Sequence, residues 1–160
     1  MLLAAGSACG RVHELDQGSY AIGFTQADVF RDDCNLAAGL GQLQTQFETF
    51  GDFVRLAYVQ QAGAICLPLQ LTGQYQLSTQ NFYADGTAAN PVLPASGQVC
   101  RLDFVAVHLD AATVSSTSFS GVLKINYVAS SPVACNCQLW LNYVATECTT
   151  STCPVPSECP

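Results

Sequence analysis

The chain has 160 residues, a length that suits one domain whose single core buries about 70% of the unfolded surface. Its formal net charge is −7 and it carries only 5 Lys and Arg residues, so it has no basic patch to displace counterions from a phosphate backbone, and nucleic acid is excluded as a partner class. Charged residues make up 11% of the chain and hydrophobic residues 49%, which predicts a surface of mostly uncharged, hydrogen-bonding side chains.

The first residues place small side chains directly before a cysteine, in the stretch LLAAGSACG. This stretch resembles the lipobox of bacterial lipoproteins, in which small residues precede a cysteine that is acylated and starts the mature chain. Ser7 and Ala8 match the small positions before Cys9, and Gly6 stands where the family prefers Leu or another aliphatic residue. The resemblance implies lipidation of Cys9 and an extracytoplasmic location, which is the outer membrane, the cell surface or the secreted fraction. No apolar stretch reaches about 18 residues, so the sequence predicts no transmembrane helix.

Period-two hydrophobic patterning begins near Gly18 and predicts β-strands. Residues 19–24 place three large apolar side chains on one face. Thr25 followed by Asp28 predicts the cap of a short helix that runs to Asn35.

The stretch 42–49 fits two patterns. It alternates apolar and polar residues like a strand, while its apolar residues together with those just before it also recur at helical intervals of three and four. Because Gly39 and Gly41 weaken a helix and residues 50–53 form a hairpin-like connection, a strand is favoured.

The next segment, 64–86, predicts one or two strands. Pro68 forces an edge position or a bulge, and the Asp85-Gly86 pair predicts the turn that ends this region.

The patterns in the rest of the chain complete the set of predicted strands and indicate the fold class. Residues 97–110 are apolar on both faces, as is typical of a central strand that is buried on both sides. Residues 118–129 and 135–145 alternate and predict two antiparallel neighbours. About seven to ten short strands predict an all-β, disulfide-stabilised antiparallel β-sandwich, or alternatively a β-barrel, with at most one or two short helices. The predicted division is a leader-like segment and linker at 1–17, one β domain at 18–148 and a Cys/Pro-rich tail at 149–160.

Cysteine usage indicates an oxidising compartment. The chain has 9 cysteines, without the paired CxxC knuckles and nearby histidines of zinc sites. If Cys9 is acylated, an even set remains for disulfides, although the odd total equally fits a free or intermolecular thiol at Cys9. The predicted disulfide cysteines are Cys34, Cys66, Cys100, Cys135, Cys137, Cys148, Cys153 and Cys159.

Two of these cysteines stand close together. Cys135 and Cys137 share one face of a predicted strand at too great a separation for an easy mutual bridge, so each is expected to reach a different partner. A thiolate metal site, built with Cys148, Cys153 and Cys159, is the alternative to disulfides at this position.

Few residues suggest chemistry. His13 lies in a polar segment and is interpreted as part of a linker, and His108 is interpreted as a partly exposed strand residue. Asp28, Asp32 and Asp33 form the densest carboxylate cluster, but their spacing does not match an EF-hand calcium loop, so a solvated turn is expected and no metal site is predicted.

Partner contact is predicted at one aromatic pair. Phe82 and Tyr83, beside the Asp85-Gly86 pair, could supply a contact platform at low entropic cost, or could cap the core. No GxSxG, HExxH, P-loop or dinucleotide-binding motif is present, so no catalytic residue and no cofactor are predicted.

These patterns predict an exported, non-catalytic structural or binding module, anchored by lipid at the cell surface or in the periplasm. Its expected partner is a protein or a second copy of itself, and a membrane is contacted only through the lipid anchor. A subunit of a self-assembling extracellular filament or surface layer is the first alternative, since low charge reduces repulsion between subunits. A secreted enzyme of unfamiliar type is a weaker one.

Overall fold

The fold is built almost entirely of antiparallel strands. The computed structural model describes residues 14–40, 43–62, 65–89, 92–95, 98–130 and 135–148, and side chains are not described for 60–66 and 92–100. The strands are β1 Gly18–Gly23, β2 Val29–Asp32, β3 Leu43–Phe50, β4 Phe53–Ala62, β5 Ile65–Gln76, β6 Asn81–Ala89, β7 Val92–Ala95, β8 Gln98–Arg101, β9 Phe104–Ser115, β10 Ser118–Val128 and β11 Cys137–Cys148. Two short 3-10 helices, η1 Gln26–Asp28 and η2 Ala37–Gly39, join them.

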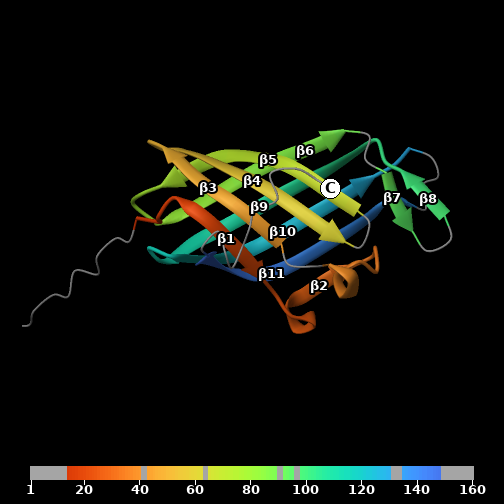
Figure 1. The fold of residues 1–160 in the computed structure, drawn as a ribbon, viewed down its shortest axis with the longest axis horizontal. Helices are drawn as coiled ribbons and strands as arrows, with labels where there is room; N and C mark the ends of the chain where they lie inside the picture. The colour runs from red at the N-terminus through yellow and green to blue at the C-terminus, as the bar shows by residue number, and fades with distance from the viewer. Residues whose placement is uncertain are drawn as a thin grey trace, which may run out of the picture.

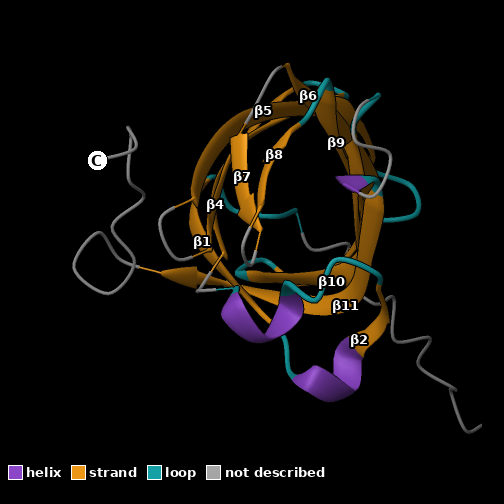
Figure 2. Ribbon diagram, turned by 90° about the vertical axis from the view of Figure 1, so that its right-hand side faces the viewer, coloured by secondary structure: helices purple, strands orange, loops and turns teal. Residues whose placement is uncertain are grey.

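Eight of these strands close into a barrel. The order around the sheet is β1-β3-β4-β5-β6-β9-β10-β11, and β1 also pairs with β11. Viewed from one end, the strands form a ring (Figure 2). The predicted all-β class is therefore confirmed, and the architecture is the barrel rather than the sandwich. The two share the same alternating pattern along each strand, and only the long-range pairing of β1 with β11 distinguishes them.

The remaining strands decorate the barrel (Figure 1). Two strands pair with successive parts of one edge of β11. β2 pairs with Leu139–Leu141, and β1 pairs with Val144–Cys148. β7 and β8 form a separate two-stranded sheet. Across the described residues, no helix is long and apolar enough to cross a membrane.

Alternation decides which side chains fill the barrel. In β10 and β11, Phe119, Leu123, Ile125, Leu139 and Leu141 are fully buried, and the residues that alternate with them face outward. Ten consecutive pairs join these two strands, from Ser118 with Thr146 to Tyr127 with Cys137, so the predicted antiparallel neighbours are confirmed.

Inward-facing glycines allow close strand approach at two positions. A Cβ on Gly73 in β5 would lie 1.7 Å from the carbonyl oxygen of Tyr83 in β6, and a Cβ on Gly121 in β10 would lie 1.9 Å from that of Asp110 in β9. Only glycine fits such a contact, and glycines at these points let the sheet coil sharply.

The barrel has two distinct ends. At one end, called the hairpin end here, lie the turns 51–52, 77–80 and 116–117, together with the start of β1 and the end of β11 (left side of Figure 1). The opposite end carries the β7–β8 hairpin.

Within the described residues, β5 and β6 are paired only near the hairpin end. We call the unpaired stretch between them, toward the opposite end, the seam. Their pairing covers only Thr72–Gln76 with Asn81–Asp85, so Ile65–Leu71 pairs with β4 alone among the described sheet pairings. Pro68 lies on this edge segment, as predicted for a residue without an amide hydrogen.

Three local predictions are wrong. The helix expected to run to Asn35 ends at Asp28, because β2 pairs with a strand more than one hundred residues away. The Asp85-Gly86 pair lies inside β6 and is no turn. The segment 97–110 divides into β8 and β9, and β9 is buried on one face only. In contrast, the strand reading of 42–49 is confirmed by β3.

Candidate functional site on the outer surface

The barrel interior is filled by large side chains. Six aromatic rings, whose neighbouring centroids lie 5.1–6.5 Å apart, pack together inside the half of the barrel toward the hairpin end. They are Tyr20, Phe47, Tyr75, Phe82, Phe119 and Tyr143. Eight-stranded barrels either fill their interior in this way or hold one small ligand there. In this half of the barrel the interior is filled by side chains.

Two of the buried tyrosines donate hydrogen bonds to backbone carbonyls. The Tyr20 hydroxyl donates to the carbonyl of Asp16 at 2.6 Å, and the Tyr143 hydroxyl donates to that of Asp110 at 3.0 Å. Burial raises the pKa of Tyr20, Tyr58 and Tyr143 well above the usual value of a phenol, so all three stay neutral at physiological pH.

A groove of about 350 Å³ crosses the outer face of β5, β6, β9 and β10. This volume lies at the lower end of the range of small-ligand sites, which is about 300–1,000 Å³. We call it the outer groove. It is lined by Gln74, Gln76, Asn81, Phe82, Tyr83, Asp110, Ala111, Ala112, Ser120, Gly121 and Val122.

Two neighbouring rows of cross-strand pairs build the outer groove. In the first row Gln74 pairs with Tyr83, Tyr83 with Asp110, and Asp110 with Val122. In the second row Gln76 pairs with Asn81, and Ala112 lies between Asn81 and Ser120. Since the side chains of alanine and serine are small, the outer surface is hollowed between the larger residues of the first row and the β5–β6 turn.

The outer groove offers an aromatic ring surrounded by hydrogen-bonding groups. Tyr83 is 38% exposed and stands in the middle of the first row. The amides of Gln74 and Asn81 each supply donors and an acceptor, and the hydroxyl of Ser120 supplies both. Asp110 is the only formally charged residue in the lining. Such a surface can stack against and hydrogen-bond to a polar partner with little electrostatic attraction.

The predicted contact pair is split by the fold. Phe82 is 3% exposed and its ring lies in the core, whereas Tyr83 points outward into the groove. The expectation that Phe82 contacts a partner is therefore corrected, because successive residues of a strand face opposite sides. The other groove residues had no local signal in the sequence, since they are spread over four strands.

His108 lies on the outer face beside the groove, within a network of charges. Its Nδ1 is 2.6 Å from Asp85 Oδ1, and its Nε2 is 3.1 Å from Asp110 Oδ2. Lys124 Nζ is 3.9 Å from the same Asp110 oxygen. No serine, threonine or cysteine side chain within the described ranges hydrogen-bonds to His108. The contacts fit the predicted strand histidine held by its neighbours.

This network belongs to a longer row of outward side chains. Successive cross-strand pairs link residues from β3 to β2 around the barrel. The row runs Glu48, Arg55, Thr72, Asp85, His108, Lys124, Trp140 and Arg31. Near its end, the cations of Arg31 and Lys124 lie 5.0 and 5.9 Å from the centre of the Trp140 ring. Such pairs stabilise the sheet surface by a few tenths of a kcal/mol each, roughly, and hold the outer face in register.

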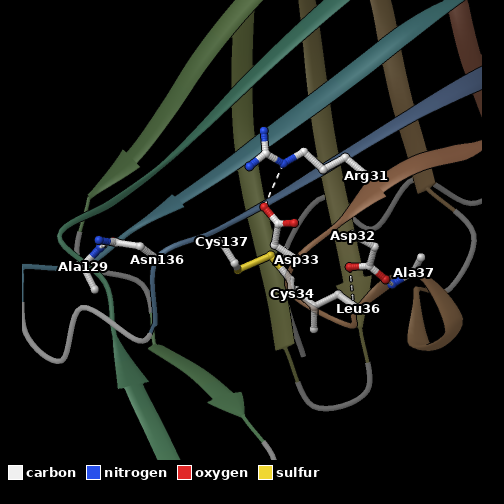
Figure 3. The surroundings of a disulfide bond; sticks show 9 residues. All are labelled: Arg31, Asp32, Asp33, Cys34, Leu36, Ala37, Ala129, Asn136 and Cys137. Carbon is white, nitrogen blue, oxygen red and sulfur yellow. Dashed lines mark hydrogen bonds and ion pairs between the residues drawn. A yellow bond between two sulfur atoms is a disulfide. The ribbon is translucent and has the colours of Figure 1, made fainter.

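One disulfide is described in full, and it secures β2 to the barrel. Cys34, just after β2, is bonded to Cys137 at the start of β11, across a sequence separation of 103 (Figure 3). Cys135 and Cys148 also form disulfides. Cys135 and Cys137 thus have different partners, as predicted. Cys9, Cys153 and Cys159 lie outside the described residues, and the side chains of Cys66 and Cys100 are not described.

The carboxylates of Asp28, Asp32 and Asp33 bind groups that are close to them in the sequence. Asp28 accepts hydrogen bonds from the amide and the hydroxyl of Thr25, both at 2.7 Å, and these bonds lower its pKa. Asp32 accepts from the amides of residues 36 and 37, and Asp33 pairs with Arg31 at 2.7 Å (Figure 3). Within the described part of the chain no group of three His, Cys, Asp or Glu residues is arranged to hold a metal ion. His13 lies outside that part.

Comparison of the chain with protein-family models, with curated proteins and with solved structures finds no match.

Proposed function

We propose that this chain is an exported, non-catalytic binding module that is held at a membrane surface by an acyl group on Cys9 and meets its partner at the outer groove. The observation that carries the binding role is the packed barrel interior combined with the outward ring of Tyr83 in a groove of about 350 Å³. Export is supported by the disulfide between Cys34 and Cys137, since such bonds persist in oxidising compartments.

The anchor is tested by intact mass. Protein extracted from its native source should start at Cys9 and carry added acyl mass, and a Cys9→Ser variant should leave the membrane fraction. An unmodified chain that retains Met1 would overturn the anchor.

The binding role is tested by photo-crosslinking. A benzoylphenylalanine placed at Tyr83 should give a crosslinked adduct in the native compartment, while the same group at Phe104 should not. Phe104 is a matched control because it is an aromatic of nearly equal exposure, 37% against 38%, outside the groove. Gln74→Ala and Asn81→Ala should weaken the adduct at Tyr83. Equal labelling from both positions would contradict a site at the groove.

A second candidate, assembly with further copies of the chain, is favoured by the seam. Residues Ile65–Leu71 of β5 have no second sheet partner among the described strands, and such edges can accept a strand from another molecule. Light scattering that rises steeply with protein concentration would support assembly, and a monodisperse monomer would count against it.

A further inference from the structure

Exposed apolar side chains gather at the hairpin end of the barrel. Eight large hydrophobic residues in the described ranges are markedly exposed, and four of them lie at this end. We call these four the apolar rim: Phe50 at 58%, Phe53 at 46%, Leu77 at 49% and Val114 at 61% exposure.

Backbone contacts join the strands and turns that carry the apolar rim. Phe50 and Phe53 are directly opposite each other across the β3–β4 turn. The amide of Tyr75 donates to the carbonyl of Asp52 at 2.7 Å, which brings the β5–β6 turn with Leu77 beside this pair. On the other side of that turn, the amide of Thr113 donates to the carbonyl of Gln80 at 2.8 Å, next to Val114. The rim therefore follows neighbouring elements around one end of the barrel.

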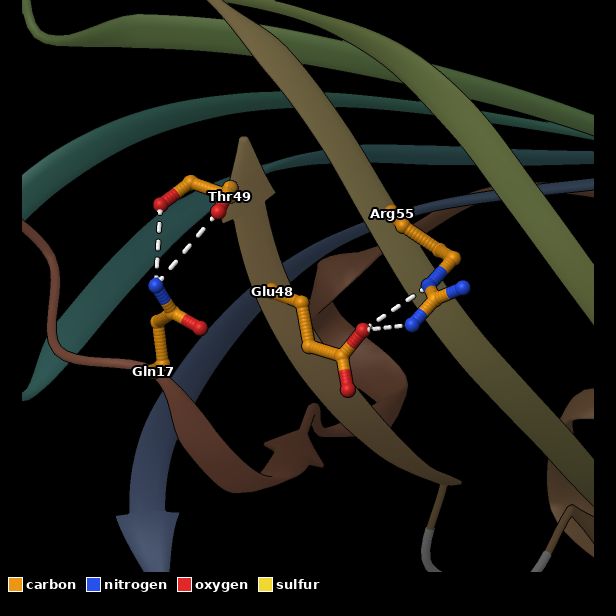
Figure 4. A network of polar contacts seen from close by, with 4 residues as sticks. All are labelled: Gln17, Glu48, Thr49 and Arg55. Atoms are coloured by element: carbon orange, nitrogen blue, oxygen red, sulfur yellow. Dashed lines mark hydrogen bonds and ion pairs between the residues drawn. The ribbon is translucent and has the colours of Figure 1, made fainter. Parts of the chain in front are cut away.

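The described chain enters the barrel at this same end. Leu15 is 3% exposed and packs in the core, and the amide of Asp16 donates to the carbonyl of Ser116 at 2.7 Å. The side-chain amide of Gln17 donates to the carbonyl and the hydroxyl oxygen of Thr49 at 3.4 Å each, one residue before Phe50 (Figure 4). Since six residues span at most about 20 Å, an acyl group on Cys9 stays close to the apolar rim.

The charges around the apolar rim determine which kind of lipid surface it can contact. Asp16, Asp52 and Glu147 lie at the hairpin end. The nearest described cation, Arg55, is paired with Glu48 (Figure 4). The guanidinium of Arg55 lies 5.3 Å from the centre of the Phe50 ring. A surface rich in anionic lipid would be repelled. A zwitterionic lipid surface carries no net charge and can accept the exposed rings.

We infer that the apolar rim rests on a zwitterionic lipid surface, so that the barrel stands with its hairpin end against the membrane. This inference rests on the proposed acyl anchor on Cys9. The tether raises the effective concentration of lipid at the rim, and the rim adds a second, weak contact that sets the orientation of the barrel. The opposite end then remains accessible to a partner.

The test measures depth at two positions. The full-length chain with a Trp140→Phe substitution, which removes its single tryptophan, receives either Phe53→Trp in the rim or Phe104→Trp at the opposite end. Each protein is anchored by an N-terminal histidine tag to phosphatidylcholine vesicles that contain a nickel-chelating lipid. Brominated phosphatidylcholine should quench the Phe53→Trp reporter at least twofold more strongly than the Phe104→Trp reporter. Equal quenching would overturn the inference.

Variants that remove one exposed aromatic ring show whether the rim itself contacts the lipid. Phe50→Ser should reduce quenching of the Phe53→Trp reporter, whereas Phe30→Ser, at a comparably exposed position on β2, should leave it unchanged. Replacing part of the phosphatidylcholine with phosphatidylglycerol should weaken the quenching, and added salt should restore it. A blue shift that depends on protein concentration without vesicles would assign the rim to a second copy of the chain and overturn the lipid contact.

The tagged protein separates this inference from the proposed anchor. If native protein lacks acyl mass but the tagged protein is quenched at the rim, the rim contact stands and the anchor fails. If Cys9 is acylated but the rim reporter is silent, the anchor stands and the rim contact is overturned.

Discussion

At Gly121, the close approach of two strands leaves no space for a side chain, so a substitution there should lower the stability of the whole barrel. Any side chain at this position would press into the carbonyl of Asp110, 1.9 Å from the new Cβ, and backbone on a paired strand cannot easily move away. Gly121→Ala should therefore lower the free energy of unfolding by about 2–3 kcal/mol, as overpacking does. Urea unfolding measures this change. Gly39→Ala is the matched control, since nothing lies within 4 Å of its new Cβ, and it should shift stability by less than about 0.5 kcal/mol. Equal effects would show that β10 can relax away from β9.

Asp28 gives a prediction about pH. The hydroxyl and amide of Thr25 donate to its carboxylate and lower its pKa from the ordinary value of 3.8. Because the folded pKa is depressed, this contact stabilises the fold at pH values above the unfolded pKa, and the contribution is lost as pH falls through the folded pKa. Thr25→Val should raise the pKa of Asp28 toward its ordinary value, and Thr25→Ser should not. An NMR titration of the carboxyl resonance measures both, and identical titrations of the valine variant and the parent would contradict the assignment.

At the scale of the element, the disulfide between Cys34 and Cys137 holds a short strand in place. β2 has four residues and pairs only with β11 among the described strands, so the crosslink supplies much of its attachment. The double variant Cys34→Ala, Cys137→Ala should lose about 2–4 kcal/mol of unfolding free energy. Hydrogen exchange should show that β2 amides lose protection first, while those of β4 follow the global change. Unchanged protection in β2 would mean that its ladder suffices without the bond.

The alternation of apolar and polar residues predicts the long strands. It does not predict contacts between residues that are far apart in the sequence. The inward residues of β10 and β11 follow directly from period two, because one slip of register would expose all of them. The sequence predicts a helix over the residues of β2 because Thr25 and Asp28 form a local cap, and only the pairing with β11 extends the chain after that cap. The aromatic pair at residues 82–83 draws attention to Tyr83, but its neighbours Gln74, Asp110 and Ser120 carry no signal in the sequence, because the sheet brings them together from separate strands.

At the scale of the whole molecule, the described side chains inside the barrel form one packed core. Phe119 illustrates this, since its ring lies 5.1–6.2 Å from the centres of four neighbouring rings, those of Tyr20, Phe47, Phe82 and Tyr143. Its side chain is fully buried. A ligand that entered this half of the barrel would have to displace these rings, so we expect the interior to bind no fatty acid.

Fluorescence titration with cis-parinaric acid tests this expectation. The parent protein should give no saturable signal, because the described side chains inside the barrel pack closely in one core. Phe119→Ala should remove about 3–5 kcal/mol of stability and open an apolar cavity that binds benzene, detected as a rise in the melting temperature when benzene is added. Leu123→Ala, also fully buried, serves if the first variant does not fold. Stoichiometric binding of the fatty acid to the parent would show that the barrel opens, and would move the binding site from the outer groove to the interior.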